Sequence, residues 1–251
     1  MTRREALRCT TVTALAFATG ACSTSTETPV NATNGRLRVR VTAPTQSIEP
    51  GLYPLGLGGS RDGLLYVPAS YRPAVAAPIA LLLHGAGRNA SEMVTPMRPF
   101  ADTTGLVLVA PDSRGSTWGA IHGDYFDDVN FIDRALGFAF ARVRVDATRV
   151  RIAGFSDGGT YSLSLGLING DFFGRVVGIS PGFIIAGPRF GKPKIFITHG
   201  TRDAILPIES TSRIIVPALR AQDYEVEYTE FDGGHGTTPE LLEQTVRWMA
   251  T

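Results

Sequence analysis

Hydrophobic residues follow one another in short runs along this chain, instead of alternating with polar residues. Such runs are typical of strands that are buried on both faces of a sheet. Three further segments have the composition of a strand, and they bring the expected number of strands to about eight. The runs are 79–83, 106–109, 150–153, 176–179 and 195–198, and the added segments are 38–41, 64–67 and 225–231.

Segments with apolar residues three and four positions apart lie between the runs, which is the period of an amphipathic helix. They are 91–104, 129–143, 208–222 and 239–249. Strands that alternate with helices predict an α/β fold with a mostly parallel sheet and helices on both faces. We expect one domain over residues 36–251, with ligands at the carboxyl ends of the strands, where the loops converge.

The first 21 residues have the pattern of an export signal. Arg3 and Arg4 resemble a twin-arginine signal, and the apolar run at 12–21 is too short to span a bilayer. The sequence Thr-Gly-Ala-Cys at 19–22 resembles a lipobox, which would make Cys22 a lipidation site after cleavage. The alternative is cleavage after Ala18, which gives a secreted protein without a lipid.

Residues 22–35 are small and polar, so they are expected to form a flexible tether. The mature protein is then expected outside the cytoplasm, either anchored by its lipid at the cell envelope or free. A lipid at Cys22 is the one membrane contact that the sequence predicts, because no apolar run reaches 18 residues.

Composition excludes several classes of function. The 24 basic and 23 acidic residues give a net charge of +1, so the chain lacks the positive field that non-specific nucleic-acid binding requires. Two cysteines are too few for a disulfide scaffold or a four-cysteine zinc site. Neither an HExxH metal motif nor a phosphate-binding loop is present. We therefore expect chemistry without a metal or an organic cofactor.

A nucleophile is predicted where the run at 150–153 meets the following helix. Gly154, Ser156 and Gly158 form the pattern Gly-x-Ser-x-Gly, in which small residues allow a sharp strand-to-helix turn. This turn holds the serine at its tip, with the positive end of the helix behind it. Ser156 is the predicted nucleophile.

A serine hydroxyl needs a base, and the chain has four histidines. His235 lies among glycines in the loop between the last strand and the last helix, and is the preferred base. Asp203, just after the run at 195–198, is the preferred acid to orient it. Asp232 is the alternative acid. His199 is expected to shape the turn near Asp203.

The turn at 84–87, His-Gly-Ala-Gly, ends another buried run and exposes backbone N–H groups. A tetrahedral intermediate requires two such donors, and we predict the N–H groups of Ala86 and Asp157. His84 is expected to support this turn. Only about 15 residues separate the runs at 176–179 and 195–198, so no helical cap fits there and the cleft should be open to bulky or polymer-end substrates.

Four segments together resemble the α/β-hydrolase superfamily: HGAG (84–87), GFSDGG (154–159), HGTRDAILP (199–207) and FDGGHG (231–236). The similarity is strongest to the phospholipase/carboxylesterase group, which overlaps with polyhydroxybutyrate depolymerase-like and feruloyl esterase-like secreted esterases. It covers roughly residues 78–249. The resemblance implies Ser156, Asp203 and His235 as the triad, with Ala86 and Asp157 as the oxyanion hole.

The resemblance extends to residues 118–133, where Trp118 and Phe126 are candidate substrate contacts and Asp128 a candidate helix cap. His122, in a glycine-flanked loop, is a further candidate for lining the substrate groove. The predicted activity is carboxylic ester hydrolysis through an acyl-enzyme. A thioesterase or peptidase with the same triad, and a non-catalytic binding protein of the same fold, remain as alternatives.

Overall fold

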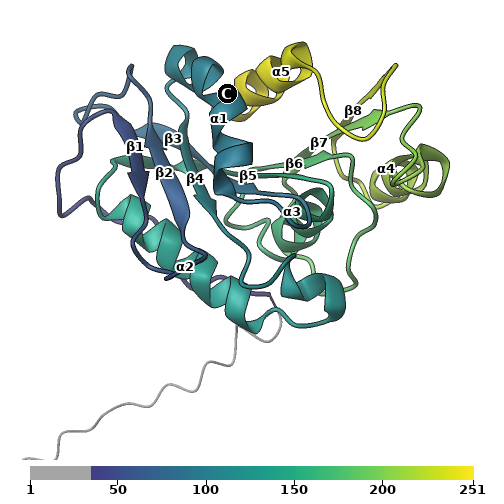
Figure 1. The fold of residues 1–251 in the computed structure, drawn as a ribbon, viewed down its shortest axis with the longest axis horizontal. Helices are drawn as coiled ribbons and strands as arrows, with labels where there is room; N and C mark the ends of the chain where they lie inside the picture. The colour runs from purple at the N-terminus through teal and green to yellow at the C-terminus, as the bar shows by residue number, and fades with distance from the viewer. Residues whose placement is uncertain (1–34) are drawn as a thin grey trace, which may run out of the picture.

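The computed structural model of the protein describes residues 35–251, and its centre is a single eight-stranded sheet (Figure 1). The predicted export signal, Cys22 and all but the last residue of the predicted tether lie outside the described residues. The strands are β1 (Gly51–Pro54), β2 (Gly63–Val67), β3 (Ala77–Leu83), β4 (Val107–Pro111), β5 (Val145–Phe155), β6 (Arg175–Ile179), β7 (Lys194–Gly200) and β8 (Val226–Phe231).

The sheet is mostly parallel, with the spatial order β1-β2-β4-β3-β5-β6-β7-β8. β2 is antiparallel to both of its neighbours, β1 and β4, and every other pair is parallel. The carboxyl ends of β3, β5, β6, β7 and β8 therefore lie along one edge of the sheet, where the loops that follow them meet.

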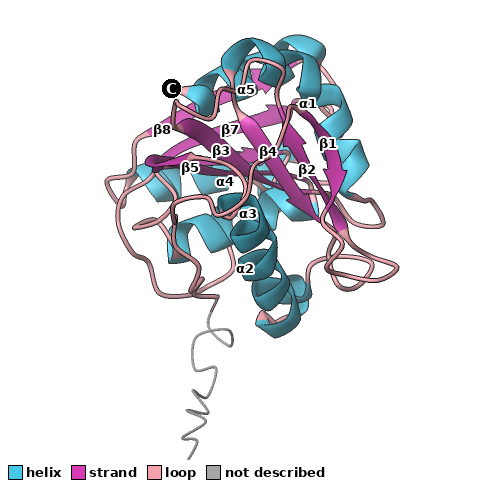
Figure 2. Ribbon diagram, turned by 90° about the vertical axis from the view of Figure 1, so that its left-hand side faces the viewer, coloured by secondary structure: helices cyan, strands magenta, loops and turns pink. Residues whose placement is uncertain are grey.

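Helices cover both faces of the sheet (Figure 2). α1 and α5 pack on one face, and α2, α3 and α4 on the other. Successive residues of a strand point to opposite faces, so Leu81 lies in the core beneath α2 and α3, whereas Leu82 lies beneath α1 and α5. The helices are α1 (Ala90–Thr104), α2 (Phe126–Phe140), α3 (Asp157–Ile168), α4 (Ser212–Arg220) and α5 (Pro239–Ala250), with short 3-10 turns η2 (Gly119–His122) and η3 (Ile208–Ser210).

The two ends of α1 and the start of α5 are set by the local sequence. The Asn89 side chain accepts hydrogen bonds from the N–H groups of Ser91 and Glu92, which caps α1 at its start. α1 ends at Gly105, whose φ of 73° is in the left-handed region. α5 begins with Pro239 at its first position, and Thr238 caps it by accepting from the N–H of Leu241.

The predicted fold class is confirmed, and seven of the predicted strands are present with shifted ends. The strand predicted at 38–41 is wrong. The N–H groups of Arg38 and Val39 donate to Asp133 of α2, and that of Leu37 donates to Asn169, so this segment is tied to side chains and not to a strand. The eighth strand is β1, which the sequence pattern missed.

The segment between β6 and β7 bears on access to the site. Residues 180–193 contain no helix and no strand beyond a single bridge between Gly191 and Gly170. Among the helices of residues 35–251, none has the length and apolar character that crossing a membrane requires. The edge of the sheet that carries the predicted site is bordered by loops, by the start of α3 and by the N-terminal parts of α1 and α5.

Candidate active site

Ser156 stands at the tip of the turn between β5 and α3, in a strained backbone conformation with φ 57° and ψ −121°. The turn is possible only because its glycines allow close approach. A Cβ on Gly154 would lie 2.0 Å from the carbonyl oxygen of Gly158, and one on Gly158 would lie 2.1 Å from that of Leu83. The Ser156 N–H donates to the carbonyl of Ile179 at 2.9 Å, which ties the tip to the end of β6.

His235 reaches this serine from the loop between β8 and α5. Its Nε2 lies 2.9 Å from Oγ of Ser156, and its Nδ1 lies 2.7 Å from Oδ2 of Asp203. The carboxylate can only accept, so Nδ1 carries the proton and Nε2 accepts from the serine hydroxyl. The Phe155 ring packs beside the imidazole at a centroid distance of 4.9 Å. The structure therefore joins the three predicted triad residues in one hydrogen-bonded chain.

Asp203 is a buried carboxylate that is held as an anion. Burial raises the pKa of its carboxyl group. Hydrogen bonds from the Leu206 N–H, from His235 and from the Ile205 N–H lower the pKa by more than burial raises it, so that the net pKa is below the ordinary value. The two N–H groups donate to Oδ1, which leaves Oδ2 for His235. The alternative acid, Asp232, is instead ion-paired with Arg202 at the surface.

The two predicted oxyanion donors, the N–H groups of Ala86 and Asp157, belong to segments that adjoin the serine. Gly85 lies against it, since a Cβ there would be 3.2 Å from the Cβ of Ser156. Asp157 is the first residue of α3, where an N–H has no partner within the helix. Within residues 35–251, neither the Asp157 N–H nor the Ala86 N–H donates to a protein acceptor. The helix end adds positive potential, so this arrangement suits a developing oxyanion.

His84 supports the 84–87 turn, as predicted. Its Nε2 accepts from the N–H of Ser113 at 2.9 Å, so Nδ1 carries the proton and donates to the carbonyl of Gly85 at 2.7 Å. Burial lowers the pKa of His84, which keeps the ring neutral. Both ring nitrogens are thus used to hold the turn.

The interpretation of Trp118 as a substrate contact is corrected by the structure. Its side chain is fully buried, and its indole N–H donates to the carbonyl of His84 at 2.8 Å. Its ring packs between those of His84 and Tyr161, with centroids 4.9 Å and 5.3 Å away. A substrate cannot reach it, and its position indicates a role in fixing the turn that carries Ala86.

Asp128 does not cap a helix, contrary to the prediction. It lies within the first turn of α2, and its two oxygens accept from the N–H groups of Arg114 and Gly119 at 2.8 Å and 2.6 Å. A cap would accept from its own helix; this carboxylate instead folds the loop between β4 and η2 against α2.

The two other candidate substrate residues lie apart from the triad. Phe126 is 39% exposed at the start of α2. His122 ends η2 and lines a polar cavity of about 320 Å³ together with Arg114, Thr117 and Asp124, with no triad residue among its lining residues. No contact with the triad supports either residue as a substrate contact.

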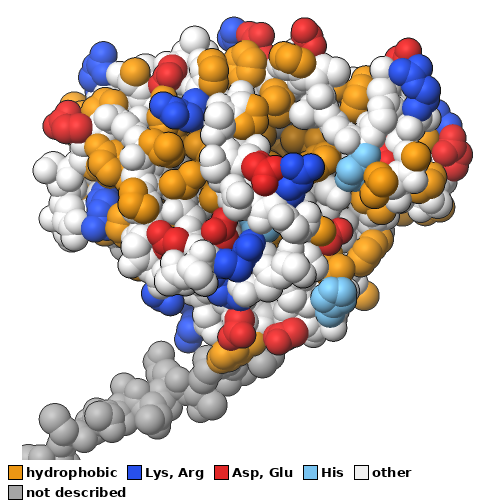
Figure 3. Space-filling model, in the orientation of Figure 1, with side chains coloured by type: hydrophobic (Ala, Val, Ile, Leu, Met, Phe, Trp, Pro, Cys, Tyr) orange, Lys and Arg blue, Asp and Glu red, His pale blue; other side chains and the backbone are white. Residues whose placement is uncertain are grey.

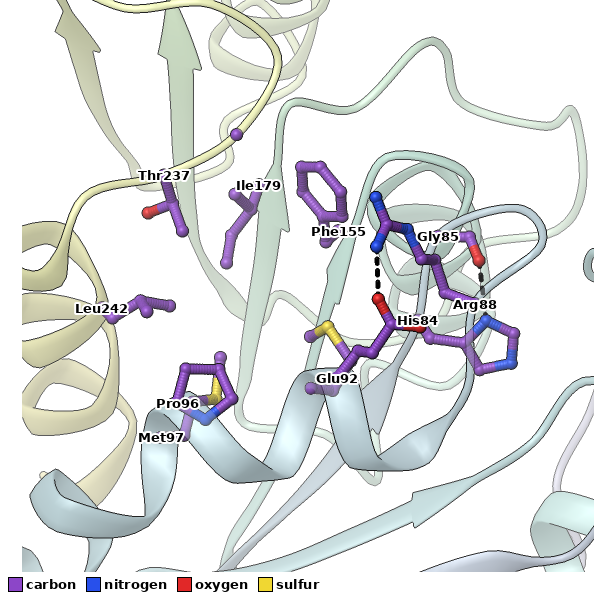
Figure 4. Close-up of a pocket in the computed structure, with 12 residues that line it drawn as sticks. His84, Gly85, Arg88, Glu92, Pro96, Met97, Phe155, Ile179, Thr237 and Leu242 are labelled. Atoms are coloured by element: carbon purple, nitrogen blue, oxygen red, sulfur yellow. Dashed lines mark hydrogen bonds and ion pairs between the residues drawn. The ribbon is translucent and has the colours of Figure 1, made fainter.

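A second cavity, of about 230 Å³, adjoins the triad and was missed by the sequence analysis (Figure 4). Figure 3 shows a hollow lined by hydrophobic side chains, with a histidine and a pair of opposite charges at its rim. The cavity is lined from α1 by Met93 and Met97, whose spacing of four residues is the available sequence signal. That spacing is equally typical of a helix face packed in the core, so it could not reveal a cavity.

Residues 35–251 contain no group of three or more histidine, cysteine, aspartate or glutamate side chains placed to hold a metal ion. The groups assembled around Ser156 are its hydroxyl, the imidazole of His235, the buried carboxylate of Asp203 and nearby backbone N–H groups. Together they are the set that acyl transfer through a covalent intermediate requires.

Proteins named as hydrolases or esterases are among those similar to this chain. The curated protein named "Putative esterase NocK", from Nocardia uniformis subsp. tsuyamanensis, is 28% identical over 156 residues, which are 57% of this chain and 45% of that protein. The chain thus spans less than half the length of this relative. No family model matches the sequence.

Solved structures share the fold at low sequence identity. The S-formylglutathione hydrolase of Agrobacterium tumefaciens aligns over 84% of this chain and 99% of its own, with 16% identity and a TM-score of 0.62. The ferulic acid esterase of Anaeromyces mucronatus aligns over 84% and 93%, with 16% identity and a TM-score of 0.61. With the strand order above, these similarities confirm the predicted α/β-hydrolase fold.

Proposed function

We propose that this protein is a serine esterase that hydrolyses carboxylic esters through an acyl-enzyme intermediate. The observation that carries the proposal is the continuous chain from Ser156 Oγ to His235 Nε2 at 2.9 Å and from His235 Nδ1 to Asp203 Oδ2 at 2.7 Å. The fold that it shares with esterases, and the similarity to NocK, support the same reaction class. No organic cofactor or metal enters the proposed reaction.

The first half of the reaction acylates the serine. His235 Nε2 takes the proton of the Ser156 hydroxyl while Oγ attacks the ester carbonyl carbon. The carbonyl oxygen becomes an oxyanion that accepts hydrogen bonds from the N–H groups of Ala86 and Asp157. The bond to the alcohol oxygen then breaks, and the alcohol leaves with the proton from His235.

The second half releases the acid. His235 takes a proton from a water molecule, whose oxygen attacks the acyl carbonyl and forms a second oxyanion. The Ser156 Oγ leaves with the proton from His235, and the carboxylic acid departs. Asp203 stays ionised throughout, because its three hydrogen bonds favour the anion, and it stabilises the imidazolium of each half.

The open edge of the sheet leaves room for large ester substrates. The loop of residues 180–193, without helix or strand, leaves Ser156 accessible to a substrate whose alcohol part is large or belongs to a polymer. Because the triad alone does not select the leaving group, thioesters and peptide amides are the alternatives that a substrate panel must separate.

The direct test is the hydrolysis of p-nitrophenyl butyrate by the wild type and by Ser156→Ala. We expect turnover only in the wild type, with both proteins folded to the same extent by circular dichroism. A fluorophosphonate probe should label the wild type and not Ser156→Ala. Full turnover by the variant would contradict the proposal, and labelling of a different serine would place the nucleophile elsewhere.

We further propose that residues 1–21 act as an export signal, that 22–35 form a tether and that the catalytic domain functions outside the cytoplasm. The arginine pair and the cysteine at position 22 support this. Mass spectrometry of the mature N-terminus distinguishes the two forms. A lipid-modified Cys22 supports anchoring, whereas an unmodified terminus at Thr19 supports free secretion and contradicts the anchor.

A further inference from the structure

The cavity of about 230 Å³ beside Ser156 lies between the N-terminal halves of α1 and α5, above the ends of β5 and β6 (Figure 4). Its walls come from four separate parts of the chain, so it is a feature of the packed fold and not of one loop. The residues that line it are His84, Gly85, Arg88, Glu92, Met93, Pro96, Met97, Phe155, Ile179, Gly236, Thr237 and Leu242.

The lining of the cavity includes the chain neighbours of the proposed reacting groups. Phe155 immediately precedes the proposed nucleophile, Gly236 follows the proposed base, and Gly85 precedes the proposed oxyanion donor Ala86. Gly85 also lies close to Ser156, because a Cβ on Gly85 would be 3.2 Å from the Cβ of Ser156. The cavity thus lies next to the position that the carbonyl carbon of an ester bound at Ser156 would take.

The interior of the cavity is apolar. Met97, Met93 and Ile179 are buried with exposed fractions of 1%, 6% and 1%, and Phe155 and Leu242 complete the walls. His84 offers no free polar atom, because both ring nitrogens are hydrogen-bonded within the turn. Apart from the Thr237 hydroxyl, the side chains of the cavity walls offer a polar group little to replace its hydrogen bonds to water, so the walls favour an apolar group.

The two charged residues of the lining neutralise each other. Arg88 and Glu92, one turn apart at the start of α1, form an ion pair at the solvent-exposed rim, and Figure 4 shows them joined beside Phe155. Neither charge is left over to bind a carboxylate or an ammonium group on the substrate. The rim thus favours an uncharged tail.

The size of the cavity limits the length of the tail. A water molecule occupies about 30 Å³ in the liquid, and a methylene group is of similar size, so 230 Å³ holds about seven or eight such groups. Methionine side chains adapt their shape, and Met93 and Met97 can therefore follow a linear chain or a single ring.

Access on the other side of the triad differs. Beyond Asp203 the loop carries Ile205, which is 69% exposed, and the loop after β6 carries Phe183, which is 47% exposed. Neither residue lines the apolar cavity. The leaving oxygen must lie within reach of His235 Nε2, so the side of these exposed residues suits the alcohol part, and the cavity suits the acyl part.

We propose that this cavity is the acyl subsite, and that it selects uncharged, apolar acyl chains of about six to eight carbons. The proposal rests on the proposed esterase function. The test measures kcat/KM for p-nitrophenyl esters from acetate to dodecanoate with the wild-type protein. We expect kcat/KM to rise by up to about fourfold per added methylene until the chain fills the cavity, and then to fall.

Two variants fill the cavity from opposite walls. Leu242→Trp does so from α5 and Pro96→Trp from α1; both positions are incompletely buried, so neither change removes a core side chain. Each should lower kcat/KM for octanoate at least about tenfold more than kcat/KM for acetate. Gln244→Trp adds the same side chain at an exposed position of α5 outside this cavity and should leave both values unchanged.

The outcomes separate this proposal from the proposed function. Absence of hydrolysis and of fluorophosphonate labelling in the wild type would overturn the esterase function itself. Hydrolysis with a flat acyl-length profile, or equal losses on acetate and octanoate in both filling variants, would overturn the acyl subsite alone. If the variants discriminate among alkyl acetates of different alcohol length and not among acyl lengths, the cavity holds the alcohol and the assignment is wrong.

Discussion

The imidazole of His199 and the carboxylate of Asp203 lie together in the interior, with Nε2 3.2 Å from Oδ2 and both side chains fully buried. His199 Nε2 is also 2.8 Å from the carbonyl oxygen of Leu206, and Nδ1 is 2.7 Å from the hydroxyl of Ser212. A carbonyl only accepts, so Nε2 carries the proton and Nδ1 accepts from Ser212. His199 therefore joins the start of α4 to the loop that holds the proposed catalytic acid.

The first prediction is that His199 positions Asp203. His199→Phe removes both hydrogen bonds and leaves the half-buried Leu206 carbonyl without its donor, which should cost about 1–3 kcal/mol of unfolding free energy. Because Asp203 then loses a neighbour of its Oδ2, kcat for p-nitrophenyl butyrate should fall by about tenfold or more. Urea unfolding and steady-state kinetics measure the two effects.

His199→Gln is the matched control for this prediction, since its amide N–H can replace the Nε2 donor. We expect it to recover most of kcat while recovering only part of the stability, because the bond from Ser212 stays lost. If the Phe and Gln variants lose kcat equally, the hydrogen bond to the Leu206 carbonyl does not position the acid. If neither loses kcat, His199 serves the fold alone.

The second prediction concerns stability at acid pH. Burial lowers the pKa of His199 and of His84 in the folded protein, whereas an unperturbed histidine titrates at about 6.5. Below that pH the unfolded chain binds protons that the folded protein does not, so stability is fully present above about 6.5 and is lost as pH falls towards the folded pKa. Each buried histidine can remove up to about 1.4 kcal/mol per pH unit in that window.

The contribution of His199 is measured as a difference. The free energy of unfolding of the wild type should fall more steeply from about pH 7 to about pH 5 than that of His199→Gln. Asp203 does not contribute there, because its depressed pKa makes its loss of stability occur below the ordinary aspartate range. Burial raises the pKa of Asp128, which acts in the opposite direction, but it is common to both proteins and cancels. Parallel pH profiles would contradict a neutral, buried His199.

The sequence predicted the strands at the centre of the sheet, because their apolar runs are buried on both faces and need no partner to be recognised. It also predicted Ser156, His235 and Asp203 as the triad, since each follows a strand end and is flanked by turn residues. β1 was missed because its burial alternates between partly buried and exposed positions at the edge of the sheet. The segment at 38–41 has the composition of a strand but satisfies its backbone through Asp133.

Side-chain contacts across the fold could not be predicted in this way. Trp118 and Asp128 were both interpreted from their place in a loop, but their roles depend on the carbonyl of His84 and on the N–H groups of Arg114 and Gly119. The acyl cavity depends on how α1 and α5 meet, and the apolar spacing of either helix is the same whether its face meets a neighbour or an opening.

The third prediction compares two glycines. Gly154→Ala would place a Cβ 2.0 Å from the carbonyl oxygen of Gly158, so the turn that presents Ser156 must shift. We expect a loss of about 1–3 kcal/mol or more and loss of activity with p-nitrophenyl butyrate. Gly137→Ala, within α2, is the control. Its Cβ would contact only the Val39 side chain, at 3.9 Å, and the change should raise the free energy of unfolding by about 0.5–1 kcal/mol. Equal effects of the two changes would contradict the role of close approach at Gly154.

The fourth prediction is that Trp118 acts on the oxyanion turn from beneath. Trp118→Phe keeps an aromatic ring against His84 and Tyr161 but removes the donor to the His84 carbonyl, which frees the peptide that precedes Gly85 and Ala86. Loss of a single oxyanion donor costs about 100-fold or more in kcat, so partial misalignment of the Ala86 N–H should cost about tenfold, with KM nearly unchanged.

Trp248→Phe is the matched control for Trp118→Phe, because it removes the other tryptophan of the chain. Its indole N–H donates to Glu227 near the start of β8, at the opposite end of that strand from the His235 loop. We therefore expect kcat to stay within about twofold of the wild type. Unfolding measurements on both variants separate loss of fold from loss of alignment. Two results would contradict the prediction: a fall in kcat for Trp118→Phe that follows only the unfolded fraction, or an unchanged kcat in the folded variant. Either would show that the hydrogen bond from Trp118 to the His84 carbonyl is not required to align the Ala86 N–H with the ester.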